Sequence, residues 1–307
     1  MPSYCLSNNY PKIFDKQHFF TFLAFMTHRL GTSHVLIEKI SSAGREEVED
    51  VLAKEEPLEI RLAYFKGNEV LQKALSVTMR TPGHDVDLAL GFLLSEGIIE
   101  QKSDIVKAEY LPHKSKLSRE NRLLVGLSKS VDFDLKKLER HFYTSSSCGV
   151  CGKASIEAVE AECDLQLTHN QSFINKNIIG SLPEILRDSQ ELFEQTGGIH
   201  AAGLFDTAGN LLLLREDVGR HNAVDKVIGA ALQQGLFPLS NYVLQVSGRT
   251  SFELVQKALM AGIPILSAVG APSSLAVELA RENEMTLLGF VKGERFNIYA
   301  GNERILG

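Results

Sequence analysis

The sequence predicts an α/β protein that begins with a smaller α+β domain. Helical stretches alternate with short apolar strands over 154–307, which is typical of a largely parallel sheet with helices on its faces. Strands outnumber helices over 35–143, and a loop rich in serine and glycine, 144–153, separates the two patterns. We therefore expect an N-terminal extension (1–34), an α+β domain, a mobile cysteine loop and an α/β domain.

Alternation and turn residues predict the elements of the α+β domain. Leu58, Ile60 and Leu62 alternate with charged residues, as in a strand with one buried face. Asp85 is expected to cap a helix that Gly97 ends. Strands are predicted over 35–40, 58–64, 74–80, 105–111 and 121–127, a loose polar loop over 112–120, and a further helix over 133–142.

Helical periodicity and apolar runs predict the elements of the α/β domain. Val224, Val227, Ile228 and Ala231 fall on one stripe of a helix that begins near residue 220. Other helices are predicted over 154–161, 182–195, 251–261 and 273–283, and strands over 201–205, 210–214, 242–246, 263–269, 286–291 and 296–300, the last two as a hairpin.

Composition excludes several classes of protein. The net charge of −6 argues against a nucleic-acid partner, since coating nucleic acid needs a basic domain. No apolar run approaches the ~18 residues that a membrane span needs. The apolar stretch 19–26 is short for a signal core, and four cysteines in 307 residues do not suggest a disulfide scaffold. A cytoplasmic location is therefore expected.

The pair Cys148 and Cys151 stands in a polar loop, where a following helix start would favour a thiolate. A structural zinc site needs four ligands, and the spacing of Cys163 and His141 from this pair matches no finger or ribbon. We expect no catalytic zinc. The pattern favours a nucleophilic thiol that carries sulfur, with the second thiol releasing that sulfur by exchange. A thiol–disulfide oxidoreductase stays an alternative.

Basic residues recur where predicted strands lead into helices, a position that favours bound anions. Arg220 and His221 stand at one helix start, although Arg220 could instead pair with Glu216 or Asp217. Arg249 follows Ser247 and could present a fork to phosphate.

Other residues around these loops have simpler interpretations. Thr250 and Glu253 match a capping box, and 270–274 reads as a helix start. His200 could be a proton donor or a ligand contact, although a core histidine is favoured. Lys292 and Arg295 would add a basic rim if their hairpin turn lies near the other loops.

Several blocks together resemble the formate dehydrogenase accessory protein family, FdhD. The match covers about 35–300, where LGFLLSEGII is followed in order by TSSSCGVCG, GGIHAA, EDVGRHNAVDK, SGRTSFELVQK and GFVKGER. The resemblance implies a sulfur carrier that takes persulfide sulfur from a cysteine desulfurase and passes it to the bis-molybdopterin guanine dinucleotide molybdenum cofactor, for formate dehydrogenase. The alternative is a cofactor-binding chaperone without sulfur transfer.

The resemblance also implies roles for individual residues. Cys148 is identified as the persulfide carrier and Cys151 as its partner. The implied fold is a three-layer α/β/α domain similar to cytidine deaminase, usually dimeric, but the His-x-Glu and the later Cys pair of a zinc deaminase are absent. Residues expected to bind the cofactor are Phe290, Val291, Lys292, Gly293, Glu294, Arg295, Arg220, His221, Ser247, Arg249 and His200.

Overall fold

The structure is a computed structural model that describes residues 31–112, 121–131 and 172–307. Several predicted features lie outside these ranges: Cys148, Cys151 and Cys163, most of the N-terminal extension and the 112–120 loop, and the helices over 133–142 and 154–161.

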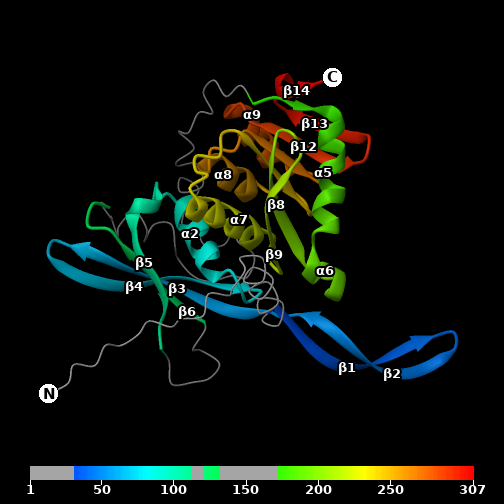
Figure 1. The fold of residues 1–307 in the computed structure, drawn as a ribbon, viewed down its shortest axis with the longest axis horizontal. Coiled ribbons are helices and arrows are strands. Elements are labelled where there is room, and N and C mark those ends of the chain that lie inside the picture. The colour runs from blue at the N-terminus through cyan, green and yellow to red at the C-terminus, as the bar shows by residue number, and fades with distance from the viewer. Residues whose placement is uncertain (1–30, 113–120, 132–171) are drawn as a thin grey trace, which may run out of the picture.

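The first part of the chain forms a four-stranded sheet with one helix against it (Figure 1). Its elements are β3 (Glu56–Lys66), β4 (Glu69–Arg80), α2 (Asp85–Ser95), the 3-10 turn η1 (Lys102–Asp104), β5 (Ile105–Tyr110) and β6 (Arg122–Leu127), with strand order β4-β3-β6-β5. Leu58, Ile60 and Leu62 are at most 1% exposed and share one apolar core with Leu88 and Leu93 of α2. The predicted alternation is therefore confirmed.

An antiparallel hairpin precedes this sheet and extends away from the body (Figure 1). Its strands are β1 (Thr32–Ser41) and β2 (Gly44–Ala53). The strand expected over 35–40 is confirmed, whereas β2 was not predicted. Acidic residues at 46, 47, 49 and 50 fall on both faces of β2, so no apolar alternation marks it as a strand.

The start of α2 differs from the prediction, and its end agrees. The N-cap residue is His84, which has a positive φ of 57°, and Asp85 does not cap the helix. Asp85 instead accepts two hydrogen bonds from Arg80, at 2.9 and 2.7 Å. A bidentate pair with a buried guanidinium is stronger than a neutral cap, which explains the choice. Gly97, with φ 66°, follows the last turn as predicted.

The second part of the chain contains a six-stranded sheet with strand order β13-β12-β11-β10-β8-β9. Its strands are β8 (His200–Asp206), β9 (Leu211–Asp217), β10 (Tyr242–Val246), β11 (Ile265–Ala268), β12 (Thr286–Lys292) and β13 (Arg295–Ala300). Only the β10–β11 and β11–β12 pairs of this sheet are parallel, so the prediction of a largely parallel sheet is wrong. Hairpins β8–β9 and β12–β13 end the sheet, and β10 returns antiparallel to β8.

Helices cover both faces of this sheet (Figure 1). They are α5 (Lys176–Asp188), α7 (Arg220–Gln234), α8 (Phe252–Met260) and α9 (Ser274–Glu282), while the short α6 (Glu191–Thr196) follows α5 and packs against β2. Phe205 and Leu288 pack with α5 on one face, while Leu204 and Leu287 pack with α7, α8 and α9 on the other. The single helix predicted over 182–195 is wrong, because the chain breaks between α5 and α6 at Ser189 and Gln190.

Short elements complete the described chain. Residues of β7 (Ile174–Asn175) and β14 (Ile305–Leu306) pair in parallel, after a 3-10 turn, η3 (Asn302–Arg304). The predicted stripe of α7, from Val224 to Ala231, is fully buried. The structure thus confirms a mixed α/β protein, whereas the likeness to cytidine deaminase and the exact domain boundaries stay predictions.

Helices α2 and α7 cross with their backbones in contact, and this crossing joins the two parts of the chain. A Cβ atom on Gly91 of α2 would lie 1.8 Å from the carbonyl oxygen of Asp225, and one on Gly229 of α7 would lie 1.9 Å from that of Asp87. No real side chain fits at such distances. The two glycines therefore set how closely the parts approach each other.

Candidate anion-binding edge

The sheet topology brings several predicted site residues to one edge. Strands β10, β11 and β12 run parallel, so their carboxyl ends lie together, where open α/β sheets bind ligands. Because β8 runs the opposite way, its first residue, His200, reaches the same edge and pairs with Asp217 at the end of β9. Helix α7 begins there with Arg220 and His221.

The loops that follow β10 and β11 pack against each other and against β12. The backbone N–H of Gly270 donates to Gly248 at 3.0 Å, and that of Phe290 donates to Gly270 at 3.2 Å. A Cβ on Gly270 would lie 2.9 Å from the Cα of Arg249. Phe290 has a positive φ of 55° at a bulge of β12, and its side chain is half exposed. A strained, exposed aromatic residue at a ligand edge is typical of a functional position.

Three basic side chains lie within electrostatic reach at this edge. Burial lowers the pKa of His200, and the positive charge of Arg220 and the proximity of His221 lower it further, while Asp217 acts in the opposite direction. A Cβ on Gly248 would lie 3.3 Å from Nδ1 of His200, so this ring packs on the β10 loop. His200 is half-buried at the edge, which corrects the expectation of a core histidine.

Glu253 of α8 holds His221 in place. Nε2 of His221 lies 3.1 Å from the hydroxyl of Ser251 and 3.7 Å from a carboxylate oxygen of Glu253. Burial alone would raise the pKa of Glu253, but hydrogen bonds with His221 and Ser251 outweigh it and lower that pKa to about 2. The carboxylate is therefore charged at neutral pH and places a negative charge beside the His221 ring.

The predicted capping box is wrong. The N-cap of α8 is Ser251, and Thr250 instead joins the neighbouring loop through Ala271 and Ser273. The role of Glu253 was missed for this reason, since its spacing from Thr250 is that of a cap and its true partner lies on another helix.

We expect Glu253→Gln to remove a pH-dependent part of the stability. A carboxyl whose pKa falls from 4.5 to about 2 on folding stabilises the protein above pH 4.5, and this contribution is lost as the pH falls toward 2. The variant should be less stable than wild type by about 2 kcal/mol at pH 7, with the difference vanishing near pH 2. Urea unfolding across this range measures it. Glu278→Gln, an exposed control on α9, should show no such convergence.

Two buried polar atoms at this edge have no hydrogen-bond partner among the described residues: Nε of Arg220 and Oγ1 of Thr250. The pairing of Arg220 with Glu216 or Asp217 is wrong. Glu216 accepts backbone N–H groups at the start of α6, and Asp217 pairs with Lys226. Unsatisfied buried donors are costly, so they indicate a ligand that accepts hydrogen bonds. We call His200, Arg220, His221, Arg249 and Thr250 the anion edge.

The remaining predicted residues occupy different positions. Ser247 extends the ladder of β10, and its hydroxyl accepts the N–H of Ala201 at 2.9 Å. Arg249 is exposed beside Gly248. Lys292 and Arg295 face each other across an exposed hairpin turn. The carbonyl of Gly293 in this turn contacts Gly180 of α5, on the opposite face from α7. Val291 is buried and Glu294 is exposed.

The described residues contain no group of three or more His, Cys, Asp or Glu side chains placed to hold a metal ion. Within the same ranges, no helix has the length and apolar character to span a membrane.

The fold is that of a two-part α/β protein, and the anion edge is a candidate site for an anionic ligand. The chain belongs to the FdhD/NarQ family, whose sequence model matches residues 53–306. This confirms the resemblance found in the sequence.

Similar proteins from several organisms match most of the chain. It is 47% identical to the "Sulfur carrier protein FdhD" of Nocardia farcinica over 89% of this chain and 95% of that one. The protein of the same name from Sulfurisphaera tokodaii is 42% identical over 89% of this chain and 98% of that one. A crystal structure described as a formate dehydrogenase accessory protein from Desulfotalea psychrophila is similar with a TM-score of 0.66 and 27% identity, covering 90% of this chain and 99% of that one.

Proposed function

We propose that this protein is a sulfur carrier in the maturation of formate dehydrogenase. It accepts persulfide sulfur from a cysteine desulfurase and transfers it to the bis-molybdopterin guanine dinucleotide molybdenum cofactor, which it binds as a substrate. The anion edge is the structural observation that supports this most strongly, because it offers a pyrophosphate buried groups that have no partner within the described part of the chain. The names of the relatives supply the general role. A cytoplasmic location and a homodimer are part of the proposal.

The sulfur steps balance with the two thiols of the motif. The thiolate of Cys148 attacks the outer sulfur of the desulfurase persulfide, and the desulfurase cysteine leaves as a thiolate. Attack of the Cys151 thiolate on the Cys148 sulfur then releases the outer sulfur as hydrosulfide, which the bound cofactor would receive as the substrate of the transfer. The two cysteines are oxidised to a disulfide, and a cellular dithiol reductant restores them.

The anion edge would hold the phosphates of the cofactor. Arg220 offers a charged donor, Thr250 offers a buried hydroxyl, and the ring of His221 is held by Ser251 and Glu253. The exposed ring of Phe290 adds a flat apolar surface of the kind on which a base stacks. These groups belong to the neighbouring loops of one sheet edge, so a single nucleotide can reach them together.

Arg220→Met should weaken guanine nucleotide binding. A charged hydrogen bond to phosphate contributes about 1.5–3 kcal/mol, so we expect GDP, used as a probe for half of the cofactor, to bind at least about tenfold more weakly. Isothermal titration calorimetry measures this. Arg45→Met on the β1–β2 hairpin is the matched control and should bind as wild type does. Equal affinities of the two variants for GDP would show that Arg220 does not contact the nucleotide.

The role itself is tested by deleting the gene for this protein from its host and restoring the gene on a plasmid. The deletion should abolish formate dehydrogenase activity while the dehydrogenase polypeptide is still made, and the plasmid should restore it. Normal activity in the deletion strain would contradict the proposed function.

A further inference from the structure

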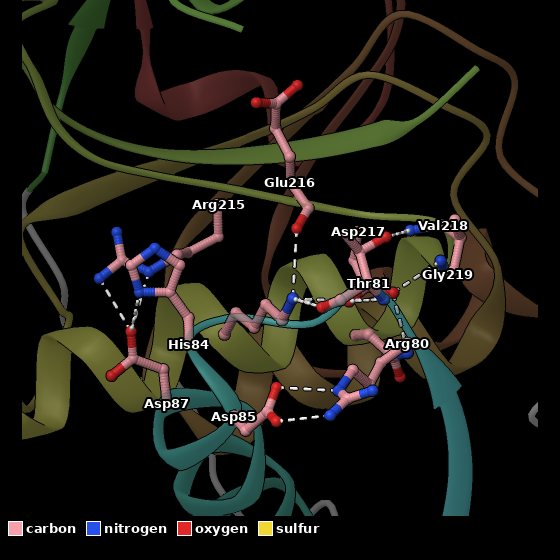
Figure 2. Close-up of polar contacts among 12 residues, drawn as sticks. Arg80, Thr81, His84, Asp85, Asp87, Arg215, Glu216, Asp217, Val218 and Gly219 are labelled. Atoms are coloured by element: carbon pink, nitrogen blue, oxygen red, sulfur yellow. Dashed lines mark hydrogen bonds and ion pairs between the residues drawn. The ribbon is translucent and has the colours of Figure 1, made fainter. Parts of the chain in front are cut away.

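Two buried ion pairs lie where the end of β4 meets the segment that leads into α7 (Figure 2). Lys226 and Asp217 are 2.7 Å apart and at most 1% exposed. Arg80 pairs with Asp85 at 2.7 Å, and both are at most 2% exposed. Burying charges is costly unless every polar group is satisfied, so such clusters serve geometry more than stability.

Thr81 lies between these pairs, and its three polar groups bond to the segment that leads into α7 and to Lys226 within α7. Its N–H donates to Asp217 at 3.1 Å, and its carbonyl accepts from Lys226 at 2.8 Å. Its hydroxyl accepts the N–H of Val218 at 3.1 Å. Thr81 is 1% exposed and directly follows Arg80, whose guanidinium is held by Asp85, so Thr81 itself has little freedom to move.

The segment held by Thr81 ends at the first residue of α7. Gly219 is the N-cap and has no side chain to cap the helix. Its own N–H donates to the carboxylate of Asp217 at 2.8 Å, which fixes the turn. The next two residues are Arg220 and His221 of the anion edge. Any displacement of 217–219 therefore moves both basic side chains, whose function depends on their direction.

We propose that Thr81 is a positioning residue for the anion edge, acting through the turn 217–219 on Arg220 and His221. The first part of the chain thus completes a site on the second part. The ligand named below rests on the proposed function, whereas the positioning does not. Thr81→Val keeps the shape and both backbone bonds but leaves the N–H of Val218 without its partner, and Thr81→Ser keeps the hydroxyl.

The first test needs no ligand. Arg220 and His221 lower the pKa of His200 and Asp217 raises it, so the titration of His200 reports where Arg220 lies. We expect Thr81→Val to change that pKa in a proton NMR titration, because the charged groups of 217–221 move relative to the His200 ring, and Thr81→Ser to leave it as in wild type. A Thr81→Val protein that is folded and titrates as wild type does would overturn the proposal.

The second test uses GDP and a double-mutant cycle. Thr81→Val should weaken GDP binding by about fivefold in the wild-type background. In the Arg220→Met background its effect should be clearly smaller, since only the part that acts through His221 remains. Fully additive losses would show that Thr81 does not act through Arg220. If wild type binds no GDP, the ligand of the proposed function is wrong, and the His200 titration still decides the positioning.

Discussion

Cys148→Ala is expected to reduce formate dehydrogenase maturation to the level of a strain without this protein. The persulfide would have no sulfur atom on which to form, and Cys151 would have no persulfide to release, so the loss should be near complete. Formate dehydrogenase activity in the deletion strain measures it, with the amount of the variant checked by immunoblot.

Cys163→Ala is the matched control, since it removes a thiol outside the motif and should retain most of the activity. A cofactor-binding chaperone makes the opposite prediction, with full activity for Cys148→Ala and a loss for Arg220→Met. Full activity in Cys148→Ala would therefore contradict the sulfur carrier and favour the cofactor-binding chaperone.

Gly229→Ala should destabilise the protein strongly. The new methyl group would lie 1.9 Å from a backbone oxygen of α2, and two packed helix backbones cannot separate without disturbing the core between the two parts. We expect a loss of about 2–3 kcal/mol in the free energy of unfolding, against less than about 1 kcal/mol gained in helix propensity. Gly91→Ala should behave alike. Chemical denaturation measures both.

Gly198→Ala is the control for this pair of variants. This glycine has no positive φ, and the carbonyl oxygen of Thr196 would lie 3.8 Å from the added Cβ, an ordinary contact. The stability of this variant should stay within about 0.5 kcal/mol of wild type. A Gly229→Ala protein as stable as this control would show that the helices do not pack at the distance described.

Local patterns were sufficient for the elements whose neighbours in sequence decide their structure. The alternation in β3 and the stripe of α7 have short periods and face one core, so both were predicted. The prediction of a largely parallel sheet failed because helix–strand alternation shows that strands are separated, not which strands become neighbours. The cap of α2 was missed because Asp85 is bound by Arg80, an interaction that capping patterns do not include.

The residues of the candidate site likewise divide into those with a local sequence signal and those without one. Arg220 and His221 were found from their place at a helix start. Thr81 and Lys226 were not, because their bond joins positions 145 apart in sequence and a buried lysine has no local signature. The one local signal for Thr81 is the pair of polar residues, Arg80 and Thr81, at the end of β4, directly before a proline and a glycine.

The most direct measurement of the central claim is the mass of the protein after incubation with a cysteine desulfurase and cysteine, followed by peptide mapping. A sulfur carrier should gain one sulfur atom on the peptide that contains Cys148, and the gain should be absent in Cys148→Ala and reversed by a dithiol. A wild-type protein that gains no sulfur under these conditions, while the desulfurase itself becomes persulfidated, would contradict the account.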